Sequence, residues 1–120
     1  TPTILGGWTS NTTISGYASN TGKWWKGAVV VNFTGAPSGS STVTISLPAT
    51  PSSFYPLGAT IGHFKIRDVS ASASTWGHTL YVGSSTMGAG YSATTRLQNA
   101  LPYTLASGDD AWFWFEFWTD

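Results

Sequence analysis

The sequence contains no cysteine and very little charge, and both absences narrow what the protein can do. Without cysteine there is no disulfide framework and no thiol chemistry. Charged residues make up only 8% of the chain, and five Lys and Arg balance five Asp and Glu. A neutral chain has no long-range field to hold a phosphate backbone, so we expect no nucleic-acid partner. No run of about 18 apolar residues occurs, which predicts no membrane insertion.

Aromatic side chains are what the sequence has in quantity. They reach 15% of the chain and include seven Trp. Together with Val and Ile they can bury a core, so the composition is that of a folded domain. The 120 residues fit one domain, residues 1–120, and the opening Thr-Pro-Thr suggests a fragment of a longer protein. The low charge also leaves little repulsion between copies, which favours an oligomer.

The pattern along the chain is that of strands. The best helical candidate, residues 93–101, contains Thr94-Thr95 and is followed by Pro102, so we expect no helix there. Short alternating or β-branched runs separated by Gly, Ser, Asn and Pro predict strands at residues 24–33, 42–47, 62–69, 75–82 and 111–118. Residues 83–90 are Gly-rich and are expected to be irregular. The fold class predicted is all-β, an antiparallel β-sandwich or jelly roll of about six to eight short strands.

The last predicted strand, residues 111–118, carries large aromatic side chains on both faces. Because strand side chains alternate, Ala111 and the three Phe point one way, while Trp112, Trp114, Glu116 and Trp118 point the other. We expect the Phe face to pack in the hydrophobic core. Three interpretations of the Trp face remain open: packing on a loop or layer of the same chain, packing against identical chains, or an exposed ligand platform. We favour burial of Trp112, Trp114 and Trp118, within the chain or at an oligomer interface.

Other aromatic residues are candidates for ligand binding. In Lys23-Trp-Trp-Lys26 one Trp is expected in the core, and Trp24 is the candidate for sugar stacking. Several aromatics fall in or beside predicted loops, where binding residues concentrate. They are Trp8, Tyr17, Tyr55, Trp76 and Tyr91, and Trp76 beside Gly77-His78 ranks first. The predicted ligand-binding set is Trp76, His78, Trp24, Tyr55, Tyr91, Asp109 and Asp110.

Catalysis and metal binding find little support in the sequence. No Gly-x-Ser-x-Gly elbow occurs, and a glycosidase needs two placed carboxylates. Of the five acids, Asp109 and Asp110 are adjacent in a predicted turn after Ser107-Gly108, and Asp120 is the last residue. His63 and His78 are the only histidines and lack the spacing of a metal site. We therefore expect no enzyme activity, no metal and no cofactor.

The C-terminal third contains the segment Leu97-Gln-Asn-Ala-Leu-Pro-Tyr-Thr-Leu-Ala-Ser-Gly-Asp-Asp110, followed by an alternating aromatic strand. It resembles the closing segment of bacteriophage tail proteins. Upstream, Leu5-Gly-Gly-Trp8 and Ile45-Ser-Leu-Pro48 followed by Phe54-Tyr-Pro56 are similar to the layout of tail-fibre tip domains. The terminal strand is richer in Trp than such tips usually need, which leaves its role open.

The resemblance implies a receptor-binding (tip) or minor tail domain, homotrimeric, with a β-sandwich head that binds cell-surface glycan. The expected location is the tail-fibre tip of the virion, outside the host cell. The expected function is non-catalytic host attachment. The alternatives are a carbohydrate-binding module of a secreted enzyme and a purely structural trimerisation cap.

Overall fold

The described residues form eight antiparallel strands in one continuous sheet. The computed structural model describes residues 2–5, 8, 10–37, 42–90 and 105–120. The strands are β1 (Ile4–Leu5), β2 (Thr12–Thr21), β3 (Trp24–Phe33), β4 (Thr44–Ser46), β5 (Thr60–Asp68), β6 (Ala73–Gly83), β7 (Thr86–Gly90) and β8 (Asp110–Trp118). Their order across the sheet is β1-β4-β7-β6-β5-β8-β3-β2. The described residues include no helix that could span a membrane.

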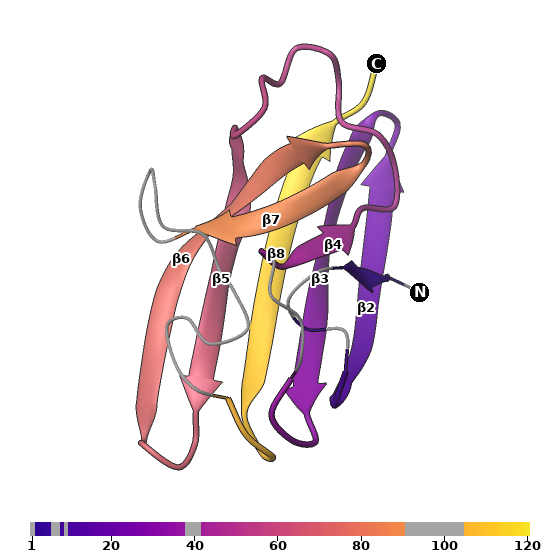
Figure 1. Cartoon of the computed structure of the whole chain (residues 1–120). Helices are drawn as coiled ribbons and strands as arrows, with labels where there is room; N and C mark the ends of the chain where they lie inside the picture. The colour runs from indigo at the N-terminus through magenta and orange to yellow at the C-terminus, as the bar shows by residue number, and fades with distance from the viewer. Residues whose placement is uncertain (1, 6–7, 9, 38–41, 91–104) are drawn as a thin grey trace.

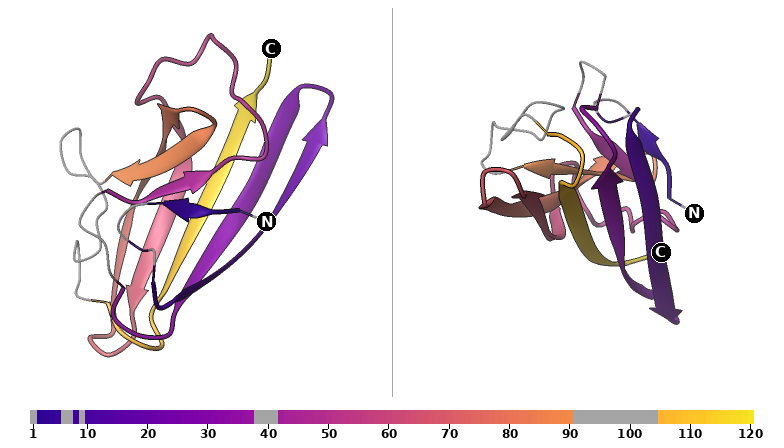
Figure 2. Two further views of the ribbon diagram at one scale, coloured as in Figure 1. Left: turned by 45° about the vertical axis from the view of Figure 1, so that its right-hand side comes forward. Right: turned by 90° about the horizontal axis from the view of Figure 1, so that it is seen from below.

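The sheet curls over on itself, so that one sheet supplies both layers. β5, β8, β3 and β2 form a long back layer, and β4 and β7 cross in front of it with β1 beside them (Figure 1). The views in Figure 2 show the same fold from the side and from below. β6 pairs with β5 on one edge and β7 on the other, so it carries the chain from one layer to the other. The predicted all-β, antiparallel, sandwich-like fold class is confirmed.

The core fills the space between the two layers. Phe113, Phe115 and Phe117 of β8 all face inward and are at most 4% exposed. They pack with Val29 and Val31 of the neighbouring β3 and with further buried side chains. The latter include Trp8, Phe33, Val43, Ile45, Phe64, Ile66, Met87 and Leu105. The Phe face of β8 is therefore the core face, as its alternation predicted.

Two glycines flank Phe115 and allow β8 to lie close between β3 and β5. Gly27 and Gly62 are both directly opposite Phe115 in the sheet register. A Cβ on Gly27 would lie 2.6 Å from Cζ of Phe115, and a Cβ on Gly62 would overlap the carbonyl oxygen of Trp114. Glycine at both positions gives the Phe115 ring its room and lets the Trp114 backbone approach β5.

All five predicted strands are present, and three further strands, β1, β2 and β7, were not predicted. The predicted strand at residues 24–33 matches β3 in both bounds, and the others differ by a few residues at their ends. β2 was missed because it is an edge strand whose residues from Ser15 to Thr21 are all exposed, so its sequence carries little apolar alternation. The expectation that residues 83–90 are irregular was wrong. Thr86–Gly90 is a strand whose Gly88 and Gly90 are buried between β4 and β6.

Candidate aromatic binding face

The side of the back layer turned away from β4 and β7, here called the outer face, carries a regular grid of side chains. Residues directly opposite each other in antiparallel strands point to the same side of the sheet. On β6, β5 and β8 the register gives three such rows of three residues. The rows are Ser74, Arg67 and Asp110; Trp76, Lys65 and Trp112; and His78, His63 and Trp114. Lys65 lies at the centre of this grid.

The rings of the grid stack on one another and form the first aromatic cluster, defined as Trp76, His63, Trp112 and Trp114. The ring centroids of Trp114 and His63 are 4.6 Å apart with an interplanar angle of 21°. Trp114 also lies 6.1 Å from Trp112 at 16° and 6.3 Å from Trp76 at 12°. The outer members are open to solvent, with Trp76 58% and Trp112 39% exposed. The cluster is therefore a rigid aromatic surface with exposed ends.

A second aromatic cluster, Trp24 and Trp118, lies farther along the same face. The two residues are directly opposite on β3 and β8, with ring centroids 4.6 Å apart, and Trp118 is 55% exposed. Between the clusters lie Lys26 and Glu116, which also face each other across β3 and β8. Trp112 and Trp118 are six residues apart on one strand, a span of about 20 Å. The face has the length of an oligosaccharide rather than of a single sugar.

Two hollows lie on the outer face, on either side of Trp114. The first, of about 360 Å³, is lined by Lys65, Arg67, Trp76, Asp110, Trp112 and Trp114. The second, of about 250 Å³, is lined by Tyr17, Lys26, Gly27, Gly62, His63, Trp114, Phe115 and Glu116. Each combines aromatic walls with a few charged or hydroxyl groups, which is the composition typical of ligand sites.

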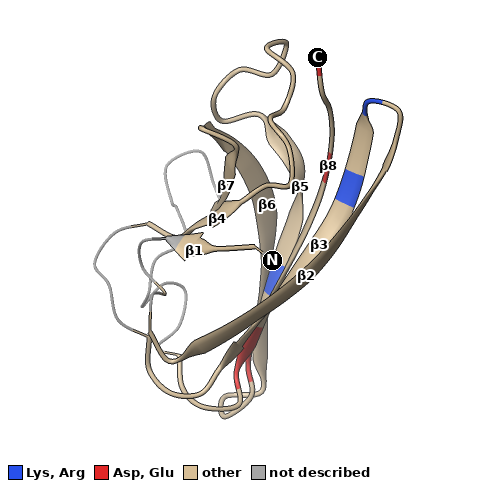
Figure 3. Cartoon of the chain, turned by 90° about the vertical axis from the view of Figure 1, so that its right-hand side faces the viewer, with Lys and Arg blue, Asp and Glu red and all other residues tan. Residues whose placement is uncertain are grey.

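Charge on the outer face is sparse and specifically placed. Asp110 forms an ion pair with Arg67, and the Nζ atom of Lys65 lies 5.2 Å from the centroid of the Trp76 ring. In Figure 3 the charged positions are few, with an acidic group near the start of β8. Cations over indole rings are attracted by the negative ring face. Lys65 is thereby held beside Trp76 inside the first hollow.

The structure places four of the predicted ligand-binding residues on the outer face. They are Trp76, His78, Trp24 and Asp110. Trp76, expected in or beside a loop, lies within β6 and is exposed. The predicted interface residues Trp112, Trp114 and Trp118 occupy the same face. Members of the two sets proposed from the sequence thus share one surface.

Asp109 belongs to the turn before β8, Asp110 is the first residue of that strand, and both carboxylates have partners within the protein. Asp109 is 2% exposed, and its carboxylate accepts hydrogen bonds from the amides of Val69 (2.9 Å) and Ala106 (2.8 Å). Asp110 is 7% exposed and paired with Arg67. The carboxylate of Asp109 is thus committed to the protein, and the predicted turn is present.

Tyr55 also binds the end of β8 through a hydrogen bond. Its hydroxyl accepts a hydrogen bond from the amide of Trp118 at 3.0 Å. Two residues on, Asp120 accepts a bond from the hydroxyl of Ser52 at 2.6 Å. That bond, with a second from the Ser53 amide, lowers the pKa of the Asp120 carboxyl. Both contacts join the second cluster to the loop before β5. Tyr91, also in the predicted ligand-binding set, lies outside the described residues.

The burial of individual tryptophans decides between earlier interpretations. Trp8 is fully buried and is not a loop aromatic available to ligand. Trp25 packs partly against the core while Trp24 faces out, as the alternation predicted. The interpretation that another part of the chain covers the Trp face of β8 is wrong for Trp112 and Trp118, which are both exposed. Tyr17 lies in β2, not a loop, and is 69% exposed.

Sequence reasoning missed the roles of His63 and Lys65 on this face. The sequence singles out His63 only as a candidate metal ligand, and it gives Lys65 no role. Alternation within β5 does put both on its polar face, but it does not reveal that Trp76 and Trp112 flank Lys65. That juxtaposition depends on the register between three strands, which residues within one strand do not specify.

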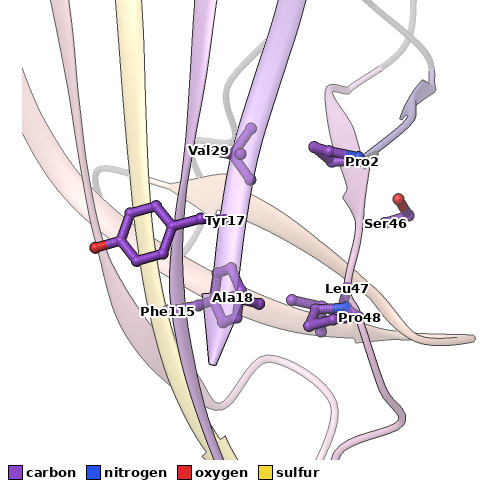
Figure 4. A pocket seen from close by; sticks show the side chains of 9 residues that line it. Pro2, Tyr17, Ala18, Val29, Ser46, Leu47, Pro48 and Phe115 are labelled. Atoms are coloured by element: carbon purple, nitrogen blue, oxygen red, sulfur yellow. The ribbon is translucent and has the colours of Figure 1, made fainter. Parts of the chain in front are cut away.

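A third cavity lies on the other side of β2, at the open seam of the curled sheet. It has a volume of about 160 Å³ and is walled by Pro2, Val29, Leu47, Pro48 and Phe115, with Ser46 among the few polar side chains. Figure 4 shows the ring of Tyr17 directed away from Pro2, Leu47 and Pro48. The cavity is smaller than a typical ligand pocket and offers few orienting groups. The outer face is therefore the stronger candidate site.

The chain matches no family model, no curated protein and no solved structure. Among the described residues, no group of three or more His, Cys, Asp or Glu is placed to hold a metal ion.

Proposed function

We propose that this protein is a non-catalytic attachment domain that binds an extended saccharide along its outer face. The observation that carries the proposal is the pair of exposed Trp clusters on one face, joined by β8 and separated by about 20 Å. Contiguous exposed aromatic surface on a protein usually marks an interaction site. The resemblance to tail-fibre tips supports host cell-surface glycan as the ligand and the virion surface as the location.

The chemistry of the face suits a sugar chain. The C–H face of a pyranose is apolar and lies well on an indole, while its hydroxyls need hydrogen-bonding partners at the edges of the site. Trp76, Trp112 and Trp118 supply exposed ring surface, and Lys26 and Glu116 supply polar groups between the clusters. A β-strand platform is rigid, so little conformational entropy is lost when an elongated ligand settles on it.

The carboxylates support a binding role over catalysis. Glycoside hydrolysis needs two carboxyl groups flanking the scissile bond. On the outer face the acids are Asp110, which is paired with Arg67, and Glu116, which lies opposite Lys26. Asp109 is committed to backbone amides.

Binding to a glycan array, followed by titration of the best ligand, tests the proposal. We expect Trp76→Ala and Trp24→Ala each to weaken binding by at least about tenfold, because each removes an anchor ring from one cluster. The matched control is Phe54→Ala, which removes a ring that is 87% exposed but belongs to neither cluster. Absence of any glycan binding, or equal affinity of the Trp variants and wild type, would contradict the proposal.

A second candidate function is a structural trimerisation cap in which the outer face packs against other copies. The observation in its favour is the same exposed Trp surface on a chain of zero net charge. One ring cannot serve both roles at once, so the candidates make opposite predictions. Sedimentation of wild type and Trp112→Ala separates them: a trimer that dissociates on this substitution supports the cap. A monomer, or a trimer unaffected by the substitution, leaves the face free for saccharide.

A further inference from the structure

We infer that the saccharide is anionic and that its acidic group is bound by Lys65 in the first hollow. The inference rests on the proposed function, since it names the class of sugar that the outer face accepts. It comes from the position of Lys65 between Trp76 and Trp112, on the central strand of the grid. A ligand that stacks across both rings must also cover this lysine.

Covering Lys65 has an electrostatic consequence. The side chain is already partly buried, and its ammonium lies against the Trp76 ring. Burying an ammonium group further is costly unless an opposite charge accompanies it. All five acidic residues of the chain lie in the described part, and among the described residues the one ion pair joins Asp110 to Arg67. No carboxylate of the protein therefore forms an ion pair with Lys65.

The surroundings of Lys65 are also net positive. Its grid neighbours on the same face include one further cation, Arg67, and one acid, Asp110. The hollow thus carries a local excess of positive charge within a chain whose net charge is zero. Aromatic walls lower the local dielectric and strengthen an ion pair formed there. A carboxylate or sulfate on a pyranose ring meets all of these requirements, whereas hydroxyl groups alone meet only the hydrogen-bonding part.

The test compares anionic glycans with their own neutral counterparts. The wild-type protein is applied to an array of neutral, uronate-bearing, sialylated and sulfated glycans. The best acidic ligand is then titrated beside its carboxyl-reduced or desulfated form. We expect the neutral form to bind at least about tenfold more weakly. Preference for carboxylate or for sulfate identifies the acidic group, and either preference supports the inference.

Three lysine variants locate the effect. Lys65→Gln is expected to weaken binding of the acidic glycan by about tenfold to a hundredfold and to remove most of the preference for the acidic over the neutral form. Lys65→Arg should retain most of the affinity, because it keeps the charge. Lys23→Gln, in the turn between β2 and β3, is the matched control and should bind like wild type. Thermal melting of each variant confirms that it is folded.

The failures of the inference and of the proposed function are distinguishable. Equal affinity for acidic and neutral forms, or unchanged binding by Lys65→Gln, overturns the inference while leaving saccharide binding intact. If no glycan binds, or if Trp76→Ala has no effect on binding, the proposed function fails and the inference fails with it.

Discussion

Trp8 offers the most direct test of how the tryptophans divide between core and binding face. It is fully buried, its ring makes edge-on contacts with Phe33 (4.8 Å) and Phe113 (6.0 Å), and its indole nitrogen has no hydrogen-bond partner in the described structure. Trp8→Ala removes the whole ring from the core, so we expect it to lose about 3–5 kcal/mol of unfolding free energy. For a small domain that is a large part of the total stability.

Trp8→Phe separates packing from the unpaired N–H group. The substitution keeps an aromatic ring against Phe33 but leaves about 40 Å³ empty, which costs about 1 kcal/mol at about 24 cal/mol per Å³. It also removes a buried donor without a partner, whose desolvation destabilises the native state by about 1–3 kcal/mol. The two effects oppose each other, so Trp8→Phe is expected to lie within about 1 kcal/mol of wild type or to be more stable.

Urea denaturation followed by far-ultraviolet circular dichroism measures both variants, with the slope of the transition checked for constancy. Trp76→Ala, on the outer face, is the comparison and should lose less stability than Trp8→Ala because Trp76 is 58% exposed. The reasoning is refuted if Trp8→Phe is as destabilising as Trp8→Ala, or if Trp76→Ala costs as much as either.

Three further substitutions test other parts of the fold. Gly62→Ala should destabilise the domain by at least about 1–3 kcal/mol in urea denaturation, because its Cβ would overlap the Trp114 backbone; a neutral result would contradict the close approach of β5 and β8. Asp109→Ala should lose about 2–4 kcal/mol and leave glycan affinity unchanged, since its carboxylate binds two backbone amides; weaker binding at unchanged stability would restore it as a ligand residue. Asp120→Asn should lower the melting temperature at neutral pH. The bond from Ser52 depresses the pKa of Asp120 in the folded state, so this stabilisation is complete above the unfolded pKa and is lost as pH falls through the folded one. A difference in melting temperature that persists in acid would rule out the carboxylate as its source.

Within single strands, the sequence predicted the structure well. Alternation in residues 111–118 separated the core Phe from the outward Trp, and the apolar run of residues 24–33 located β3, whose Val29, Val31 and Phe33 lie in the core. β2 was not predicted because most of its residues are exposed, so its sequence does not alternate between apolar and polar residues. For the site, the sequence supplied Trp76 and Trp24 but not Lys65. Lys65 is part of the candidate site because it lies between Trp76 of β6 and Trp112 of β8. The sequence of one strand does not specify which residues of another strand lie opposite it.

The position of β8 in the sheet has a consequence for how the protein is made. β8 pairs with β3 on one side and β5 on the other. Both of these strands leave the ribosome long before β8 is translated. The hairpins β2–β3 and β5–β6 can each form from neighbouring segments, but each then waits with one apolar strand edge unpaired. Folding is therefore governed by contacts between distant parts of the chain, which form slowly. In a cell, translation speed and chaperone access during that interval should limit the yield of active protein more than its final stability does.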